Sequence, residues 1–253
     1  MKIINNYESG NIQILGFPRM GTTYLANLLF YSNETPDILI SEPFNKYQIL
    51  YKKKRKPMEK IKVKKSCHGD IFEGTIIDNL NTYIDDVSEI IVKNHFNKNI
   101  IKMINDDSFY NIFIFRKNLF ETSLSLSLAK ITGIWNSYHE KRYMISNYMF
   151  KSIITTYLNQ YLLYLKIITI HLDAIVFYED FTFDPVIDLK KFNLTCSNDI
   201  YENFDEEITP KQHVIINYNR LKKIYYDYVK DINIPGITID GEIIHLDKFK
   251  EYE

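Results

Sequence analysis

Two glycines, Gly16 and Gly21, enclose a short segment whose groups could bind an anion. The segment contains one cation, Arg19, and two hydroxyls, those of Thr22 and Thr23, come directly after it. Glycine-rich turns can direct several backbone N–H groups at one point, and a helix that starts there adds unpaired N–H groups and the positive end of its dipole. The pattern therefore predicts a phosphate-binding loop.

One position separates this loop from that of nucleoside triphosphatases. The triphosphatase pattern, G-x-x-x-x-G-K-[ST], has a lysine directly after the second glycine. Thr22 stands there in this chain, so the loop keeps its amides and hydroxyls but lacks that lysine. This difference argues against Mg-ATP as the ligand.

Lys93 and His95 are a second pair of residues that could do chemistry. They follow an apolar run at residues 90–92 and, being two apart on an extended strand, point to the same side. A lysine supplies a fixed positive charge, and an imidazole can accept a proton near neutral pH. The pair suits charge stabilisation combined with proton removal.

Glu42 ends another apolar run, at the kind of strand end where open α/β sheets bind ligands.

Arg116 ends the apolar run at residues 111–115. Nucleoside triphosphatases end such a strand in an aspartate that holds magnesium. An arginine instead offers a rigid fork of N–H donors to a phosphate, beside a helix that we expect to begin around Asn118. This position therefore predicts a second anion contact.

In their order along the chain, these motifs resemble those of sulfotransferases that use 3′-phosphoadenosine 5′-phosphosulfate (PAPS). The segment P-R-M-G-T-T-Y at residues 18–24 is similar to the P-K-S-G-T-T-W loop that holds the 5′-phosphosulfate. Lys93-x-His95 resembles the K-x-H motif of cytosolic members, and residues 177–181 (F-Y-E-D-F) resemble F-Y-E-D-L on their last core strand. The likeness spans residues 12 to about 185.

The resemblance implies an in-line transfer of a sulfuryl group to a hydroxyl or amine. Arg19 and Lys93, with loop amides and hydroxyls, would hold the sulfuryl and 5′-phosphate oxygens. His95 would remove the proton of the acceptor, and Glu42 is the competing candidate for that role. The implied catalytic set is His95, Lys93, Arg19 and Glu42, with no metal.

The resemblance also implies how the nucleotide is held. Tyr24 would pack on the adenine and Tyr178 would touch its edge. Arg116 and a serine of the following helix would bind the 3′-phosphate. Counting from Arg116, the family's serine falls on Leu124, and one additional loop residue would bring Ser125 into place. The implied cofactor-binding residues are Arg19, Met20, Gly21, Thr22, Thr23, Tyr24, Arg116, Ser123, Ser125 and Tyr178.

The chain departs from the family's pattern in two places. The loop cation is Arg19, a planar fork, where most relatives have a lysine, a point donor. The R-K-G segment that closes the cofactor site near the carboxyl end of cytosolic members is missing. Lys211 could replace it, but we expect this lysine to be exposed.

Apolar runs and helical patterns predict the elements that position these residues. Strands separated by helices favour an α/β fold, a single domain over residues 1–253 with a central parallel β-sheet flanked by helices, and the resemblance implies the P-loop sulfotransferase architecture. The expected strands lie at residues 12–15, 37–41, 89–95, 111–115 and 174–181, and the expected helices follow Gly21 and Asn118, cover 138–170, begin at Asp184 and cover 217–230. We expect a hairpin at 238–244 and a solvated face or loop in the lysine-rich stretch 52–65.

Composition limits the possible functions. The chain has 31 Lys and Arg against 32 Asp and Glu residues, which excludes the extended positive field of a general nucleic-acid binder. No signal peptide or apolar stretch of about 20 residues is found, so we expect a cytoplasmic protein without a membrane partner. The two cysteines lack metal-ligand spacing. The expected partner is a small-molecule or glycan acceptor, and both monomer and dimer remain open.

Two other functions also remain open. A P-loop small-molecule or nucleoside kinase would use a similar loop with Mg-ATP. A catalytically decayed nucleotide-binding protein would bind 3′-phosphoadenosine 5′-phosphate (PAP), yet never release it from PAPS.

Overall fold

The computed structural model describes residues 10–30, 32, 35, 38–41, 48–52, 59–63, 89–95, 109–134, 141–171, 173–192, 194–195 and 211–229. Glu42, the predicted alternative base, lies outside the described residues, as does the predicted hairpin at 238–244. No helix in these described ranges is both long and apolar enough to cross a membrane.

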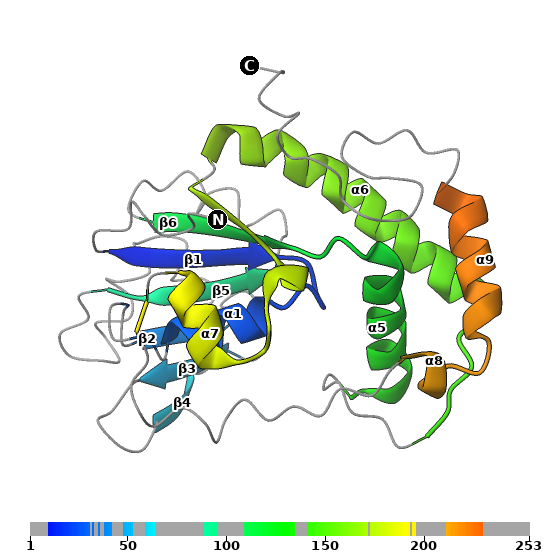
Figure 1. Cartoon of the computed structure of the whole chain (residues 1–253), viewed down its shortest axis with the longest axis horizontal. Helices are drawn as coiled ribbons and strands as arrows, with labels where there is room; N and C mark the ends of the chain where they lie inside the picture. Colours follow the sequence, from blue (N-terminus) through cyan, green and yellow to red (C-terminus); the bar gives the residue numbers. More distant parts are fainter. Residues whose placement is uncertain are drawn as a thin grey trace.

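The centre of the molecule is a seven-stranded β-sheet (Figure 1). Its strands are β1 (Asn11–Gly16), β2 (Ile38–Ser41), β3 (Gln48–Lys52), β4 (Glu59–Val63), β5 (Ile91–His95), β6 (Phe109–Phe115) and β7 (Ala174–Phe177). Their order across the sheet is β4-β3-β2-β5-β1-β6-β7. The five strands from β2 to β7 in this order run parallel, and β3 and β4 add an antiparallel edge. The predicted α/β fold with a central parallel sheet is confirmed.

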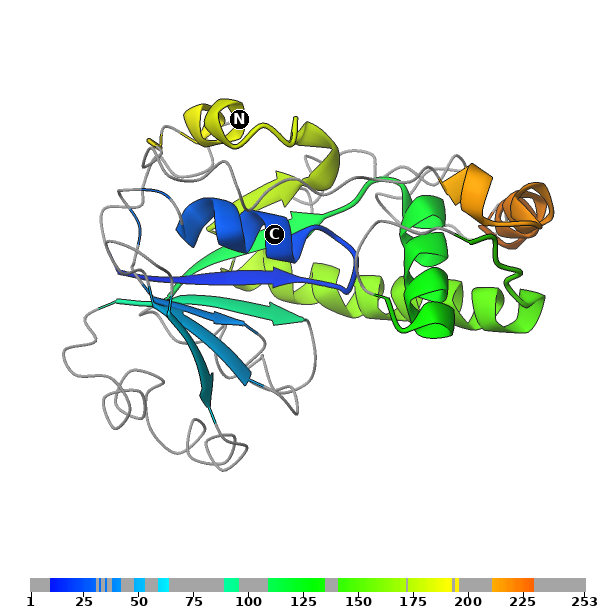
Figure 2. The same ribbon diagram turned by 90° about the horizontal axis from the view of Figure 1, so that it is seen from below.

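Helices cover both faces of this sheet. The helices of the described ranges are α1 (Thr22–Phe30), α5 (Leu119–Thr132), α6 (Asn147–His171), the 3-10 turn η1 (Tyr178–Asp180), α7 (Pro185–Lys191), α8 (Lys211–Val214) and α9 (Tyr218–Val229). Helices α1 and α7 lie on one face, here called the α1 face, and α6 lies on the other, the α6 face (Figure 2). Helices α5 and α9 stand beyond the carboxyl ends of the strands (Figures 1 and 2).

Strand β1 is the centre of the core. Ile12 and Ile14 are fully buried on the α1 face, and Leu15 is fully buried on the α6 face. Burial on both faces suits the apolar residues of this strand, although Gln13 at its middle is also fully buried. The chain leaves β1 through α1 on one face and leaves β6 through α5 and α6 on the other. The carboxyl ends of these two neighbouring strands are therefore a topological switch point, where open α/β sheets bind ligands.

Local sequence signals set two of the helix starts. The Asn118 side chain accepts a hydrogen bond from the Glu121 N–H and caps α5. The Asp184 side chain accepts from two amides at the start of α7, where Pro185 takes the first helical position. Both are preferred ways of satisfying unpaired N–H groups at a helix start. The predicted starts of these helices are confirmed.

Two elements differ from the expectation. The lysine-rich stretch was expected to be a solvated face or loop, but β3 ends in it and β4 lies within it, so this part of it is strand rather than loop. Residues 60–63 alternate Lys-Ile-Lys-Val, a period of two that is typical of a strand. The long helix α6 begins at Asn147, later than the predicted residue 138.

Candidate anion-binding site

The glycine loop connects β1 to α1 at the switch point. Phe17 and Met20 are both fully buried in the core of the α6 face, and the Met20 N–H donates to the Phe17 carbonyl at 3.3 Å. These two side chains attach the loop to the core and leave Pro18 and Arg19 partly exposed between them. Met20, predicted to contact the cofactor, therefore uses its side chain in core packing and its amide in the turn.

Both glycines are required by close contacts. A Cβ on Gly16 would lie 2.7 Å from Thr22 Cγ2 and 2.9 Å from Ile114 Cγ2. Gly21 has a φ of +88°, and its Cβ would lie 2.5 Å from Tyr178 Cδ2. Since side chains rarely tolerate such contacts or this φ, the loop can pass this close to β6 and η1 only with glycine at both positions.

Arg19 is held by side chains from the helices of the α6 face. Its φ is 69°, a left-handed conformation that is uncommon outside glycine. Its Nε donates to Ser125 Oγ on α5 at 2.8 Å. The carbonyl of the preceding residue, Pro18, accepts a hydrogen bond from the Tyr157 hydroxyl on α6 at 2.7 Å. The loop cation is therefore oriented from both sides of its peptide.

Arg116 lies beside the same loop. Its guanidinium carbon is 4.3 Å from the centroid of the Tyr178 ring, and that ring is the one that approaches Gly21. Among the described residues, the buried Nε of Arg116 has no hydrogen-bond partner. The glycine loop and the arginine at the end of β6 thus meet across one aromatic ring.

Lys211, at the start of α8, is a third cation near these groups. Its Nζ is 3.5 Å from Glu121 Oε2, and its side chain is only 15% exposed. Burial lowers the pKa of Lys211, and the charges of Arg116 and Arg19 act in the same direction. The expectation that Lys211 is exposed was wrong, because α8 packs against the amino-terminal part of α5. No local sequence signal marks this contact, which joins residues 90 positions apart.

Lys93 and His95 lie on the other side of the loop. In the pairing of β5 with β1, Lys93 is opposite Ile14 and His95 is opposite Gly16. Opposed residues of neighbouring strands share a face, so both side chains are on the α1 face. Lys93 is 4% exposed. The strand thus brings this pair to the start of the loop.

Tyr24, which is predicted to contact adenine, also makes contacts within the protein that join two helices. Its hydroxyl donates to Asp188 Oδ2 at 2.8 Å, and its ring lies 5.1 Å from the ring of Phe181 and 5.0 Å from that of Phe183, between centroids. Burial, followed by the hydrogen bond to Asp188, raises the pKa of Tyr24 well above its ordinary value. Tyr24 therefore joins α1 to the start of α7.

The remaining predicted residues occupy different environments. Thr22 is buried and Thr23 is exposed. Of the two candidate serines, Ser125 bonds to Arg19, whereas the buried Ser123 hydroxyl has no hydrogen-bond partner among the described residues. Sequence reasoning missed Glu179, whose carboxylate accepts from the backbone N–H groups of residues 117 and 118 at 3.0 and 3.1 Å. Glu179 lies next to Tyr178 in the F-Y-E-D segment, and its place in that motif was the sequence signal that could have identified it.

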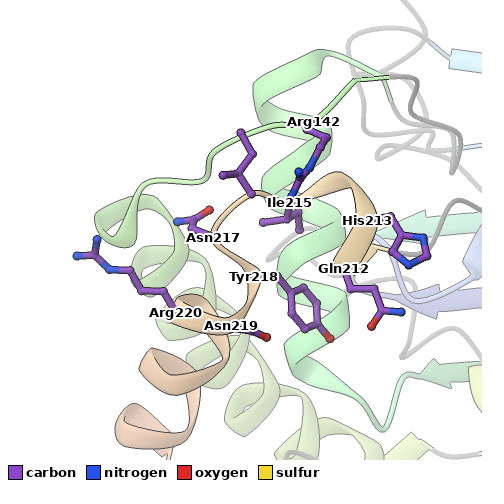
Figure 3. Close-up of a pocket in the computed structure, with 9 residues that line it drawn as sticks. Arg142, Gln212, His213, Ile215, Asn217, Tyr218, Asn219 and Arg220 are labelled. Atoms are coloured by element: carbon purple, nitrogen blue, oxygen red, sulfur yellow. The ribbon is translucent and has the colours of Figure 1, made fainter.

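A surface pocket of about 550 Å³ lies near α8 and the start of α9 (Figure 3). None of the predicted site residues lines it. The Asn217 side chain there is bonded to both backbone groups of Ile145, and Figure 3 shows Arg220 pointing away from Tyr218. The pocket is lined by Arg142, Gln212, His213, Ile215, Ile216, Asn217, Tyr218, Asn219 and Arg220.

The chemistry of the site is that of a local cationic cluster. Arg19, Arg116 and Lys211 come from three separate segments, and the Glu121 carboxylate lies beside Lys211. In the described part of the chain, no three His, Cys, Asp or Glu side chains lie close enough together to hold a metal ion.

No family model, curated protein or solved structure matches this chain. The arrangement itself suits a ligand with more than one anionic group.

Proposed function

We propose that the protein binds PAPS at this edge of the sheet and transfers its sulfuryl group to a hydroxyl or amine acceptor. The observation that best supports this proposal is the Tyr178 ring, which lies against Gly21 and beneath the Arg116 guanidinium. It brings a phosphate-binding loop and a separate phosphate-binding arginine within reach of one small ligand. PAPS carries two separate anionic groups on one ribose, a 5′-phosphosulfate and a 3′-phosphate.

The residues present fit such a ligand. A buried guanidinium N–H without an acceptor is unfavourable, by about 1–3 kcal/mol, and the Nε of Arg116 is of this kind among the described residues. A phosphate oxygen would satisfy it. Arg19 and the N–H groups of the loop would hold the 5′ end, and Arg116 would hold the 3′-phosphate. Tyr24 and Tyr178 would contact the adenine.

Bound PAPS supplies an activated sulfuryl group. His95, beside the first glycine of the loop, would accept the proton of the attacking hydroxyl or amine, and Glu42 is the alternative proton acceptor. Lys93 and Arg19 would place positive charge where negative charge develops. Because Lys93 is almost fully buried, its charge acts in a poorly screened environment, where fixed charges contribute most to catalysis.

Binding of PAP tests the first half of the proposal. In isothermal titration calorimetry, we expect PAP to bind more tightly than Mg-ATP. Arg116→Ala should weaken PAP binding by about 10-fold or more, since it removes a charged hydrogen-bond donor. Arg220→Ala, which removes an exposed arginine on α9, should leave binding unchanged. Tighter binding of Mg-ATP would favour the kinase alternative instead.

Transfer of label from radioactive PAPS to a panel of small hydroxyl, amine and glycan acceptors tests the second half. His95→Ala should lower turnover by about 10²–10⁴-fold without weakening PAP binding to the same extent. Tight PAP binding without transfer to any acceptor would favour the non-catalytic alternative. Unchanged turnover in His95→Ala would remove this residue from its role and direct attention to Glu42.

A further inference from the structure

Arg19 has an unusual backbone conformation for a charged residue in a ligand-binding loop. Its φ is 69°, and Phe183 is the only other non-glycine residue with positive φ in the described ranges. In this conformation the Cβ of an L-residue lies too close to the following carbonyl oxygen. Such a residue keeps its conformation only where its surroundings impose it, and such residues are concentrated at ligand sites.

Two hydrogen bonds hold Arg19 in place. The Tyr157 hydroxyl donates to the Pro18 carbonyl, which belongs to the peptide group that enters Arg19. Ser125 Oγ accepts from Arg19 Nε and so fixes the guanidinium at the other end of the side chain. The first bond orients the backbone of Arg19, and the second orients its charge.

The environment of Tyr157 keeps its hydroxyl a hydrogen-bond donor. The residue is 2% exposed, and its ring packs edge-on against Phe17, with 6.1 Å between centroids. Burial raises the pKa of Tyr157 far above neutral pH, although the nearby charges of Arg19 and Arg116 act in the opposite direction. The hydroxyl therefore stays protonated and donates to the loop, and both arginines are near enough to influence it.

We propose that Tyr157 and Ser125 are positioning residues that hold Arg19 in the orientation in which it binds a phosphate group. This inference deepens the proposed function and rests on it in one respect, that the loop binds an anion. The residue types at positions 125 and 157 would then determine affinity through Arg19. Neither hydroxyl would have to touch the ligand for this effect.

The structure offers a matched control for each residue. Tyr225 and Ser127 are as deeply buried as Tyr157 and Ser125, but neither hydroxyl bonds to the loop in the described structure. The Tyr225 hydroxyl has no hydrogen-bond partner among the described residues, and the Ser127 hydroxyl donates to the Ser123 carbonyl within α5. Tyr157→Phe and Ser125→Ala therefore remove a hydroxyl together with a hydrogen bond. Tyr225→Phe and Ser127→Ala remove a hydroxyl that does not bond to the loop.

Affinity for inorganic pyrophosphate and for PAP is measured by calorimetry for all four variants. Tyr157→Phe and Ser125→Ala should each weaken binding of both probes by about 5- to 10-fold, the usual effect of one hydrogen bond. Tyr225→Phe and Ser127→Ala should change it by less than about 2-fold. Equal affinities in test and control variants would overturn the proposal. If Tyr157→Phe fails to fold, Ser125→Ala decides by itself.

A double-variant cycle separates positioning from general damage to the loop. In the Arg19→Ala background, Tyr157→Phe should cause no further loss of pyrophosphate affinity, because the residue through which it acts is gone. The same loss in both backgrounds would show that Tyr157 does not act through Arg19. Wild-type protein that binds neither probe would refute the proposed function together with this inference. If the wild-type protein binds the probes but the test and control variants bind them equally well, only the inference is refuted.

Discussion

The two faces of the sheet hold the glycine loop in different ways. On the α6 face, hydroxyls from α5 and α6 bind the loop around Arg19, the residue proposed to meet the ligand. On the α1 face, Asp188 of α7 accepts a hydrogen bond from Tyr24 of α1, the helix that follows the loop. The comparison indicates that the hydrogen bonds on the α6 face orient Arg19, whereas those of Asp188 on the α1 face join α1 to the start of α7.

Asp188 shows this structural role most clearly. It is fully buried, and its two carboxylate oxygens accept from the N–H and hydroxyl of Thr182, the N–H of Phe183, the hydroxyl of Tyr24 and the ammonium of Lys191. Phe183 has a φ of 61°, so the carboxylate stabilises an unfavourable turn. A buried charge is tolerated where so many donors surround it.

The largest expected effect follows from removing this charge. Asp188→Asn places an NH₂ group among donors, and should lower the free energy of unfolding by about 3–5 kcal/mol, the usual cost of leaving buried charged partners unmatched. Urea denaturation measures the change. Asp184→Asn is the control, because asparagine caps a helix about as well as aspartate and should cost only a few tenths of a kcal/mol. Equal losses in the two variants would contradict the structural role of Asp188.

An intermediate effect is expected at Gly21, where the two faces meet through Tyr178. Gly21→Ala should lower the free energy of unfolding by about 1–2 kcal/mol for the positive φ, and the clash with Tyr178 should also weaken PAP binding. Calorimetry and urea denaturation give the two quantities. Gly133→Ala has a φ of +69° but meets no atom within 4 Å. It should therefore lose stability and leave binding unchanged, and weakened binding there would argue against the importance of the Tyr178 contact.

Much of the fold was predictable because its signals are local. Continuous apolar runs marked the parallel strands, and Asp184 with Pro185 marked the start of α7. The edge strand β4 was missed although residues 60–63 alternate, because a dense run of lysines was interpreted by its charge rather than by its period. In that stretch the alternating pattern was the more informative signal.

The site was less predictable, because its supporting contacts join distant parts of the chain. Tyr157 was expected to be a core residue, and its ring is one, but its hydroxyl reaches a loop 139 residues away. The bond between Tyr24 and Asp188 spans 164 residues. Neither residue type nor spacing encodes such a contact, which depends on how helices pack on the sheet. The roles of Arg19, Arg116 and His95 stay predictions until they are measured.

The smallest expected effect concerns Lys211, whose side chain is only 15% exposed and lies near the charges of Arg19 and Arg116. Because its pKa is lowered in the folded protein, the unfolded chain binds more protons, and Lys211 makes the free energy of unfolding rise with pH toward its ordinary value of 10.5. Lys211→Met should flatten this rise on the alkaline side of neutrality, below the ordinary pKa of 10.5, while weakening PAP binding.

The pH window and the control sharpen this test. The pKa values of Tyr24, Tyr157, Tyr218 and Tyr225 are raised above 10.0, so these residues make stability fall above about pH 10, the opposite sign, and urea denaturation must stay below that range. Lys222→Met removes an exposed lysine of α9 and should change neither the slope nor the affinity. If the free energy of unfolding depends on pH in the same way in Lys211→Met and in the wild type, folding does not lower the pKa of Lys211. The comparison between the two faces would then rest only on the hydrogen bonds around Arg19 and those of Asp188.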